Sequence, residues 1–186
     1  MTGVLIMRRT LTVTGLIFVM LLICACSATP ESQTEKATLS ADVAAAKARF
    51  MEEDPDMEKT FRDAYGYAIF PTIGKGAVGI GGAYGRGLVF EKGRKIGYCD
   101  MSQGTIGLQL GGQAYSEVIL FEDKGALDNF TSGEFEFSAQ ASAVAATAGA
   151  STTADYSDGV MVFTIAKGGL MYEASIGGQK FDYEPK

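Results

Sequence analysis

The chain has 186 residues and carries 16 Lys and Arg against 22 Asp and Glu, a formal net charge of −6, and it contains no histidine. An acidic chain is poorly suited to nucleic-acid binding, and the absence of histidine removes the commonest general base and zinc ligand. We therefore expect a single domain that is not an enzyme, with no catalytic residue, cofactor or metal site.

The first 26 residues resemble the signal peptide of a bacterial lipoprotein. Arg8 and Arg9 precede an apolar run, Leu11 to Ile23, that is shorter than the roughly 20 residues a membrane-spanning helix needs. Ala25-Cys26 fits cleavage before a cysteine whose thiol is then lipidated. Ser27 stands where an aspartate would retain the protein at the inner membrane. We expect export and lipid anchoring at Cys26, on the periplasmic face of the outer membrane, with an ordinary secretory signal as the alternative.

The predicted organisation has three parts. Residues 1–25 form the signal peptide. Residues 26–37 are polar, have no apolar period and are expected to form a flexible tether. Residues 38–186 form one domain.

Two helices are predicted at the start of this domain and one further on. The first follows Ser40, a suitable N-cap, and covers residues 41–51, which are mostly strong helix formers. The second, shorter helix follows Asp54-Pro55 and ends before Gly66. A third helix, from Lys124 to Phe130, is predicted between strands.

Beyond Gly66, short segments rich in Val, Ile, Phe and Tyr alternate with glycines. Lys92-Gly93 predicts a tight hairpin turn between two strands. The class is α+β, with a mainly antiparallel, glycine-rich sheet that is barrel-like or sandwich-like. The predicted strands are 67–70, 77–84, 87–91, 94–100, 104–110, 116–121, 134–143, 160–166, 170–176 and 180–184.

Residues 74–79 satisfy the G-x-G-x-x-G pattern of dinucleotide-binding loops. The residues that follow are glycine-broken and strand-like, whereas a nucleotide site needs a helix there. Glycines at alternate positions instead allow another group to approach one face of a sheet closely.

One local basic cluster stands out. Arg86, Lys92, Arg94 and Lys95 lie within ten residues and are opposed only by Glu91. A hairpin would bring them near one tip, where they could hold phosphate head groups. The alternative is a hairpin that is merely solvated.

From about Ala64 to Pro185 the chain resembles the SYLF domain family. The resemblance rests on an ordered set of short motifs, none decisive alone. They are residues 66–71 (GYAIFP), 79–87 (GIGGAYGRG), 106–113 (IGLQLGGQ), 168–171 (GGLM) and 175–181 (SIGGQKF).

This resemblance implies a non-enzymatic domain that associates with phospholipids. In eukaryotic members an N-terminal amphipathic helix and basic surface engage phosphoinositides, and some members bind actin. Here the helix after Ser40 has only Lys47 and Arg49 as cations, and actin is not expected in the periplasm. Lys75, between the matched segments 66–71 and 79–87, and Arg86, inside the second of them, are the first candidates for lipid contact.

Two functions remain open at this stage. In the first, the domain binds anionic phospholipid or lipopolysaccharide through Lys75, Arg86, Lys92, Arg94 and Lys95. In the second, it is an envelope scaffold that binds a protein partner, and lipid serves only as its anchor. The acidic net charge favours the second, because it opposes anionic bilayers.

Overall fold

The computed structural model describes residues 30, 32–78, 80–106, 111–138, 142–168 and 174–186. Cys26 and residues 1–25 lie outside this range. Within it, the elements in chain order are α2 (Gln33–Glu53), α3 (Met57–Asp63), β1 (Gly66–Val78), β2 (Ile80–Glu91), β3 (Arg94–Ile106), β4 (Gly111–Phe121), α4 (Lys124–Thr131), β5 (Ser142–Ala145), α5 (Ala150–Thr153), β6 (Val160–Gly168), β7 (Ala174–Ser175) and β8 (Gln179–Pro185). The predicted α+β class is confirmed.

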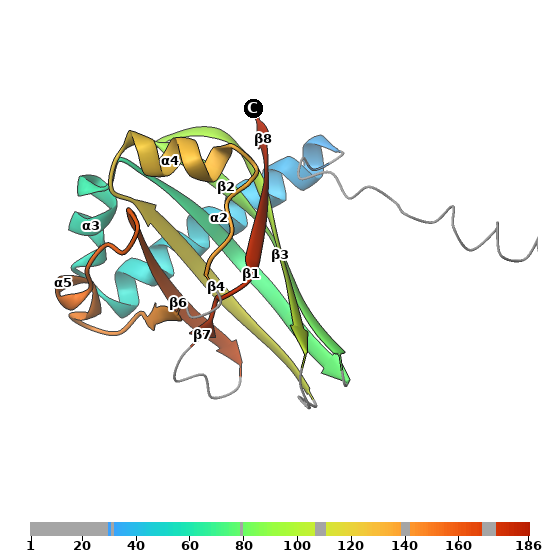
Figure 1. Ribbon diagram of the computed structural model, residues 1–186. Coiled ribbons are helices and arrows are strands. Elements are labelled where there is room, and N and C mark those ends of the chain that lie inside the picture. The colour runs from blue at the N-terminus through green and yellow to red at the C-terminus, as the bar shows by residue number, and fades with distance from the viewer. Residues whose placement is uncertain (1–29, 31, 79, 107–110, 139–141, 169–173) are drawn as a thin grey trace, which may run out of the picture.

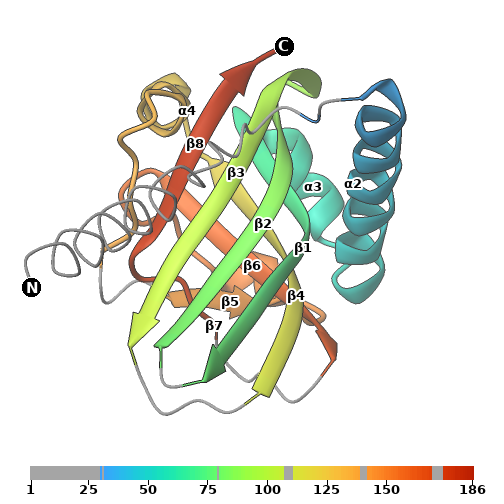
Figure 2. The same cartoon turned by 90° about the vertical axis from the view of Figure 1, so that its right-hand side faces the viewer.

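The strands form a sheet in the order β7-β5-β6-β4-β1-β2-β3-β8 (Figures 1 and 2). Neighbouring strands run antiparallel, except for β5 and β6, which are parallel. The sheet curls around an interior, and in the described part of the chain its end strands, β7 and β8, do not pair with each other. It is therefore a curved, open sheet.

The central strands are longer than predicted. The predicted strand 77–84 is divided between β1 and β2, and the predicted strand 94–100 continues in β3 to Ile106. The predicted strand 134–143 was largely wrong, because β5 begins only at Ser142 and Glu136 forms an isolated bridge with Lys180. Parts of three predicted segments, at residues 107–110, 139–141 and 170–173, lie outside the described range.

Alternation along the strands creates two buried clusters, one on each face of the sheet. The outer cluster joins α2 and α3 to the sheet through residues such as Phe50, Phe61 and Tyr67. The interior cluster includes Phe70, Ile119 and Phe181 and is covered at one end by α4. Figures 1 and 2 show α2 and α3 together on one side of the sheet, apart from α4.

Helix α2 begins earlier than predicted. Ser32 is its N-cap, and a capping box pairs the Ser32 hydroxyl with the Glu35 amide and the Glu35 carboxylate with the Ser32 amide, both at 3.1 Å. Ser40 instead lies inside the helix, where its hydroxyl donates to the Lys36 carbonyl. Residues 33–37, predicted as tether, are thus helical. None of the described helices is long and apolar enough to cross a membrane.

The glycines divide into two groups by what surrounds them. A Cβ on Gly87 would lie 2.6 Å from the Ile69 carbonyl oxygen and 2.8 Å from the Phe70 ring. At Gly97 a Cβ would collide with the Tyr183 ring. At Gly74, Gly76 and Gly104 it would meet nothing within 4 Å. Close approach therefore explains only the first group.

This difference predicts unequal losses of stability for two alanine substitutions in neighbouring strands. We expect Gly87→Ala to lower the free energy of unfolding by about 1–3 kcal/mol, because backbone and ring must move apart. Gly104→Ala should change it by less than about 0.5 kcal/mol. Urea unfolding followed by circular dichroism measures both, and equal effects would show that Gly87 is not in close contact.

Candidate functional site

The turn between β2 and β3 is the hairpin predicted at Lys92-Gly93. Both residues have positive φ, 48° and 77°, as a two-residue turn of the type that matches strand twist requires. The Lys92 amide donates to the Tyr65 carbonyl at 3.0 Å, and its ammonium lies 4.8 Å from the centre of the Tyr65 ring. The Lys92 and Arg94 side chains are exposed.

Helix α2 brings further lysines to this hairpin. Lys95 lies 4.7 Å from the centre of the Tyr98 ring and donates to its hydroxyl at 3.3 Å, and Lys36 of α2 lies 5.7 Å from the same ring. Lys47 of α2 donates to the Tyr67 hydroxyl at 2.8 Å. Each ammonium is thus held beside an aromatic ring.

Lys47 also borders a groove between α2, α3 and the hairpin turn. Its ammonium lies 4.6 Å from the centre of the Phe61 ring and 4.4 Å from that of Tyr67. The groove has a volume of about 510 Å³. Its walls combine apolar and cationic groups with one acid: Lys47, Met51, Glu58, Phe61, Arg62, Ala64, Tyr67, Lys92 and Gly93.

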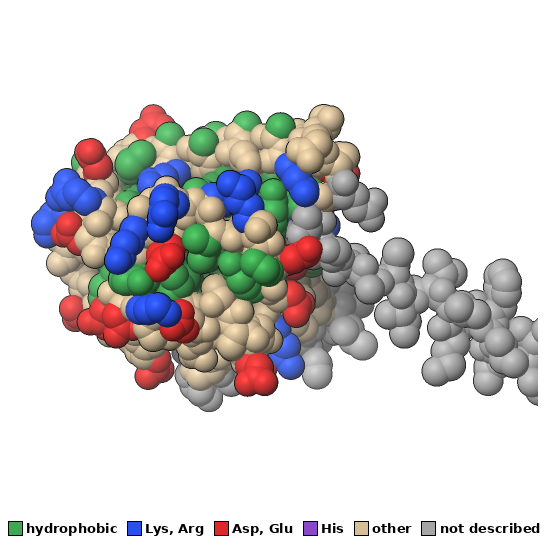
Figure 3. Space-filling view, turned by 90° about the horizontal axis from the view of Figure 1, so that it is seen from above, with side chains coloured by type: hydrophobic (Ala, Val, Ile, Leu, Met, Phe, Trp, Pro, Cys, Tyr) green, Lys and Arg blue, Asp and Glu red, His purple; other side chains and the backbone are tan. Residues whose placement is uncertain are grey.

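We call Lys36, Lys47, Lys92, Arg94 and Lys95 the lysine face. Figure 3, seen from above, shows Lys and Arg side chains gathered among hydrophobic ones on this end of the molecule, with several acidic groups around them. The chain as a whole is acidic. The positive charge is therefore a local property of this end.

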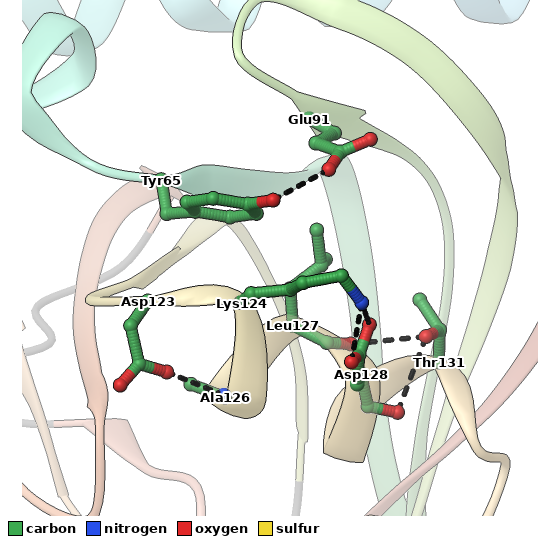
Figure 4. Close-up of polar contacts among 8 residues, drawn as sticks. All are labelled: Tyr65, Glu91, Asp123, Lys124, Ala126, Leu127, Asp128 and Thr131. Atoms are coloured by element: carbon green, nitrogen blue, oxygen red, sulfur yellow. Dashed lines mark hydrogen bonds and ion pairs between the residues drawn. The ribbon is translucent and has the colours of Figure 1, made fainter.

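Acidic groups near the hairpin are engaged with neighbouring side chains. Figure 4 shows the Tyr65 hydroxyl donating to a Glu91 carboxylate oxygen, at 2.8 Å, above α4. This hydrogen bond, with burial and the charge of Glu91, raises the pKa of Tyr65. On α4, Lys124 is paired with Asp128 at 2.6 Å. Glu91 is thus turned toward Tyr65.

The structure brings together three of the five predicted lipid-binding residues. Lys92, Arg94 and Lys95 lie at the hairpin, as predicted. Arg86 lies further along β2, where its Nε is 3.3 Å from a carboxylate oxygen of Asp100. Lys75 pairs with Ala83 in the β1–β2 register, whereas Glu91 pairs with Gly66. Lys75 is therefore about 30 Å from the hairpin turn along the strands.

Lys36 and Lys47 were missed by sequence reasoning, as were the aromatic residues that hold them. Their positions in α2 are far from the hairpin in sequence, and an alanine-rich helix gives no signal of which face packs on the sheet. Among the described residues, no cluster of His, Cys, Asp or Glu is arranged to hold a metal ion. Cys99 is a buried thiol, and burial raises its pKa well above the usual range.

The fold and this surface define a class: an open, mainly antiparallel sheet backed by helices, with a cationic and aromatic surface at one end. Residues 102–184 match the family model Ysc84, described as "Las17-binding protein actin regulator". The chain is also 34% identical over 134 residues to "Beta cell expansion factor A" of Aeromonas veronii, over 72% of this chain and 51% of that protein. The chain belongs to this SYLF family. It spans about half the length of the curated relative it matches.

Proposed function

We propose that the domain binds the anionic head groups of membrane lipids through the lysine face. The observation that supports this most strongly is the gathering of five cations, four of them beside aromatic rings, on an otherwise acidic chain. Each exposed basic side chain near an anionic surface contributes about 1 kcal/mol. The rings of Tyr67 and Tyr98 are themselves buried, and they hold the ammonium groups in place beside them.

We further propose that Cys26 carries a lipid anchor on the periplasmic face of the outer membrane. Helix α2 begins at the end of the molecule where the β2–β3 hairpin lies (Figures 1 and 2), and Lys36 contacts the Tyr98 ring there. Five residues separate Cys26 from Ser32, so the two Cα atoms are six steps and at most about 20 Å apart. An anchor at Cys26 would therefore hold the lysine face close to the bilayer.

Neutralising the hairpin should weaken membrane binding. In a chain that begins at Ser27, we expect Lys92→Gln with Arg94→Gln to reduce affinity for anionic vesicles by about 30-fold, because two contributions of about 1 kcal/mol are lost. The matched control is Lys167→Gln with Lys180→Gln, which removes the same charge elsewhere. Equal affinities for the two double variants, measured by vesicle sedimentation, would contradict a role for the hairpin.

A second candidate function is protein binding, and the groove beside α3 favours it. Half-buried Met51 lies in this groove beside Lys47 and Lys92, which suits an acidic peptide with apolar side chains. In this reading the chain is an envelope scaffold, and lipid only anchors it. Loss of a salt-sensitive protein partner on Met51→Ser, which changes a half-buried side chain of the groove, with vesicle binding unchanged, would support this function over the first.

A further inference from the structure

A carboxyl group is enclosed in the interior of the sheet. Glu117 of β4 is fully buried. Its Oε2 accepts a hydrogen bond from Gln179 Nε2 at 3.1 Å, and its Oε1 has no hydrogen-bonding partner among the described residues. No ion pair in the described part of the chain involves it. Burial raises its pKa from 4.5 to about 8.

The partner of Glu117 is the first residue of the edge strand β8. Gln179 is fully buried and its Nε2 also lies 3.3 Å from the Tyr115 hydroxyl. The turn before it is held by a hydrogen bond from Gln103 Nε2 to the Gly177 carbonyl, at 2.8 Å. Two glutamines therefore fasten the start of β8 to the interior, and one of them depends on Glu117.

β8 covers an aromatic cluster. Its Phe181 ring lies 5.0 Å from that of Phe130, 5.7 Å from Phe70 and 5.6 Å from Phe137, centre to centre. Along its length β8 pairs with β3, and on its other edge with residues 136 and 137. A strand attached by one full neighbour is easier to release than a central strand.

The groups around Glu117 do not titrate near neutral pH. The charge of Glu117 itself is therefore what changes with pH in this part of the interior. From β1 and β6 it is faced by Phe70 and Thr164, which are its register partners. Tyr115 and Cys99 are the titratable neighbours, and burial raises the pKa of both. The charged residues of β8 that are exposed, Lys180 and Asp182, alternate away from the interior.

We propose that β8 is a strap whose attachment to the interior requires Glu117 to be protonated. Ionisation puts an unpaired negative charge in an apolar cluster, whereas release of residues 176–185 admits water to the carboxylate. The closed strap is thus favoured at low pH. As the pH rises from the ordinary pKa of glutamate to the raised pKa of the buried group, the population of the open form increases. Above the raised pKa, the equilibrium between the closed and open forms no longer changes with pH.

Hydrogen exchange in the intact chain tests this proposal, with Glu117→Gln as the matched variant. Glutamine keeps the shape and an acceptor oxygen but cannot ionise. The intrinsic rate of amide exchange increases with pH equally in both proteins. The exchange rate of the unmodified chain divided by that of the variant therefore reports only the difference in strand opening. We expect this ratio for β8 amides to rise by about 10-fold per pH unit between about pH 5.5 and 7.5. Amides in α2 and β1 need global unfolding to exchange, so at every pH we expect their opening free energies to be larger than those of β8.

Two results would overturn the proposal. A ratio that does not change with pH would show that Glu117 does not control β8. Opening free energies for β8 amides equal to those for β1 amides at every pH would show that Glu117 affects only global unfolding. Should Glu117→Gln fail to fold, carbon-13 NMR of the Glu117 carboxyl group in the unmodified chain decides: a titration near pH 4.5 would contradict burial of a protonated acid, and one near pH 8 with parallel loss of β8 protection would support the strap.

Discussion

Glu117→Gln should raise the free energy of unfolding by about 3–5 kcal/mol at pH 8, while leaving it nearly unchanged at pH 4. In the unfolded chain the carboxyl group ionises near its ordinary pKa of 4.5, whereas burial keeps it protonated to about pH 8 in the folded chain. The folded state therefore binds the extra proton, and stability falls as pH rises through this window. Each tenfold difference in proton affinity between the folded and unfolded chains corresponds to about 1.4 kcal/mol.

Urea unfolding at several pH values measures this effect. The unmodified chain should lose stability between about pH 4.5 and pH 8 and then level off, and the variant should lack this slope. The amide oxygen of glutamine can still accept from Gln179, and the Gln179 Oε1, which has no partner among the described residues, is available to its amide hydrogens. Identical pH profiles for the two proteins would contradict a neutral Glu117.

Asp54→Ala should lower the free energy of unfolding by about 3–5 kcal/mol. Asp54 is fully buried between α2 and α3. Its carboxylate accepts from the backbone amides of Ser151 at 2.8 Å, Gly149 at 3.1 Å and Asp56 at 3.2 Å. It thereby fixes the start of α5 to the end of α2, and alanine would leave these amides without an acceptor.

The control for this prediction is Asp42→Ala, which removes an exposed carboxylate from α2 and should cost less than about 0.5 kcal/mol. Burial acts to raise the pKa of Asp54, but the hydrogen bonds from Ser151, Gly149 and Asp56 outweigh it and lower the pKa. The contribution of Asp54 is thus present above its ordinary value of 3.8 and is lost as pH falls below it. Similar losses for both variants at pH 7 would contradict its bridging role.

Local sequence signals predicted much of the fold. The Lys92-Gly93 turn, helix α4 and the antiparallel class follow from turn residues, helix formers and alternation. The start of α2 was misplaced because Ser32 and Ser40 are both plausible caps, and only Glu35, three residues after Ser32, completes a capping box. Residues 134–138 alternate like a strand, yet two phenylalanines there pack on Phe181 instead.

The candidate site was predictable only where it is local. Lys92, Arg94 and Lys95 are close in sequence, so a hairpin brings them together. The ion pair between Arg86 and Asp100 could not be predicted, because it depends on the β2–β3 register that places the two residues opposite each other. Lys36 and Lys47 join the face through packing of α2 on the sheet, which no short motif encodes. The burial of Glu117 could not be predicted from its apolar strand, because it depends on the curvature of the whole sheet.

We propose that the lysine face recognises anionic lipid. The most direct measurement is sedimentation of the chain from Ser27 onward with vesicles of zwitterionic lipid and of mixed zwitterionic and anionic lipid, at low and moderate salt. We predict binding to the anionic vesicles alone, weakened by salt because the contacts are charged and exposed. Equal binding to both vesicle types, or none to either, would contradict lipid recognition by the folded domain.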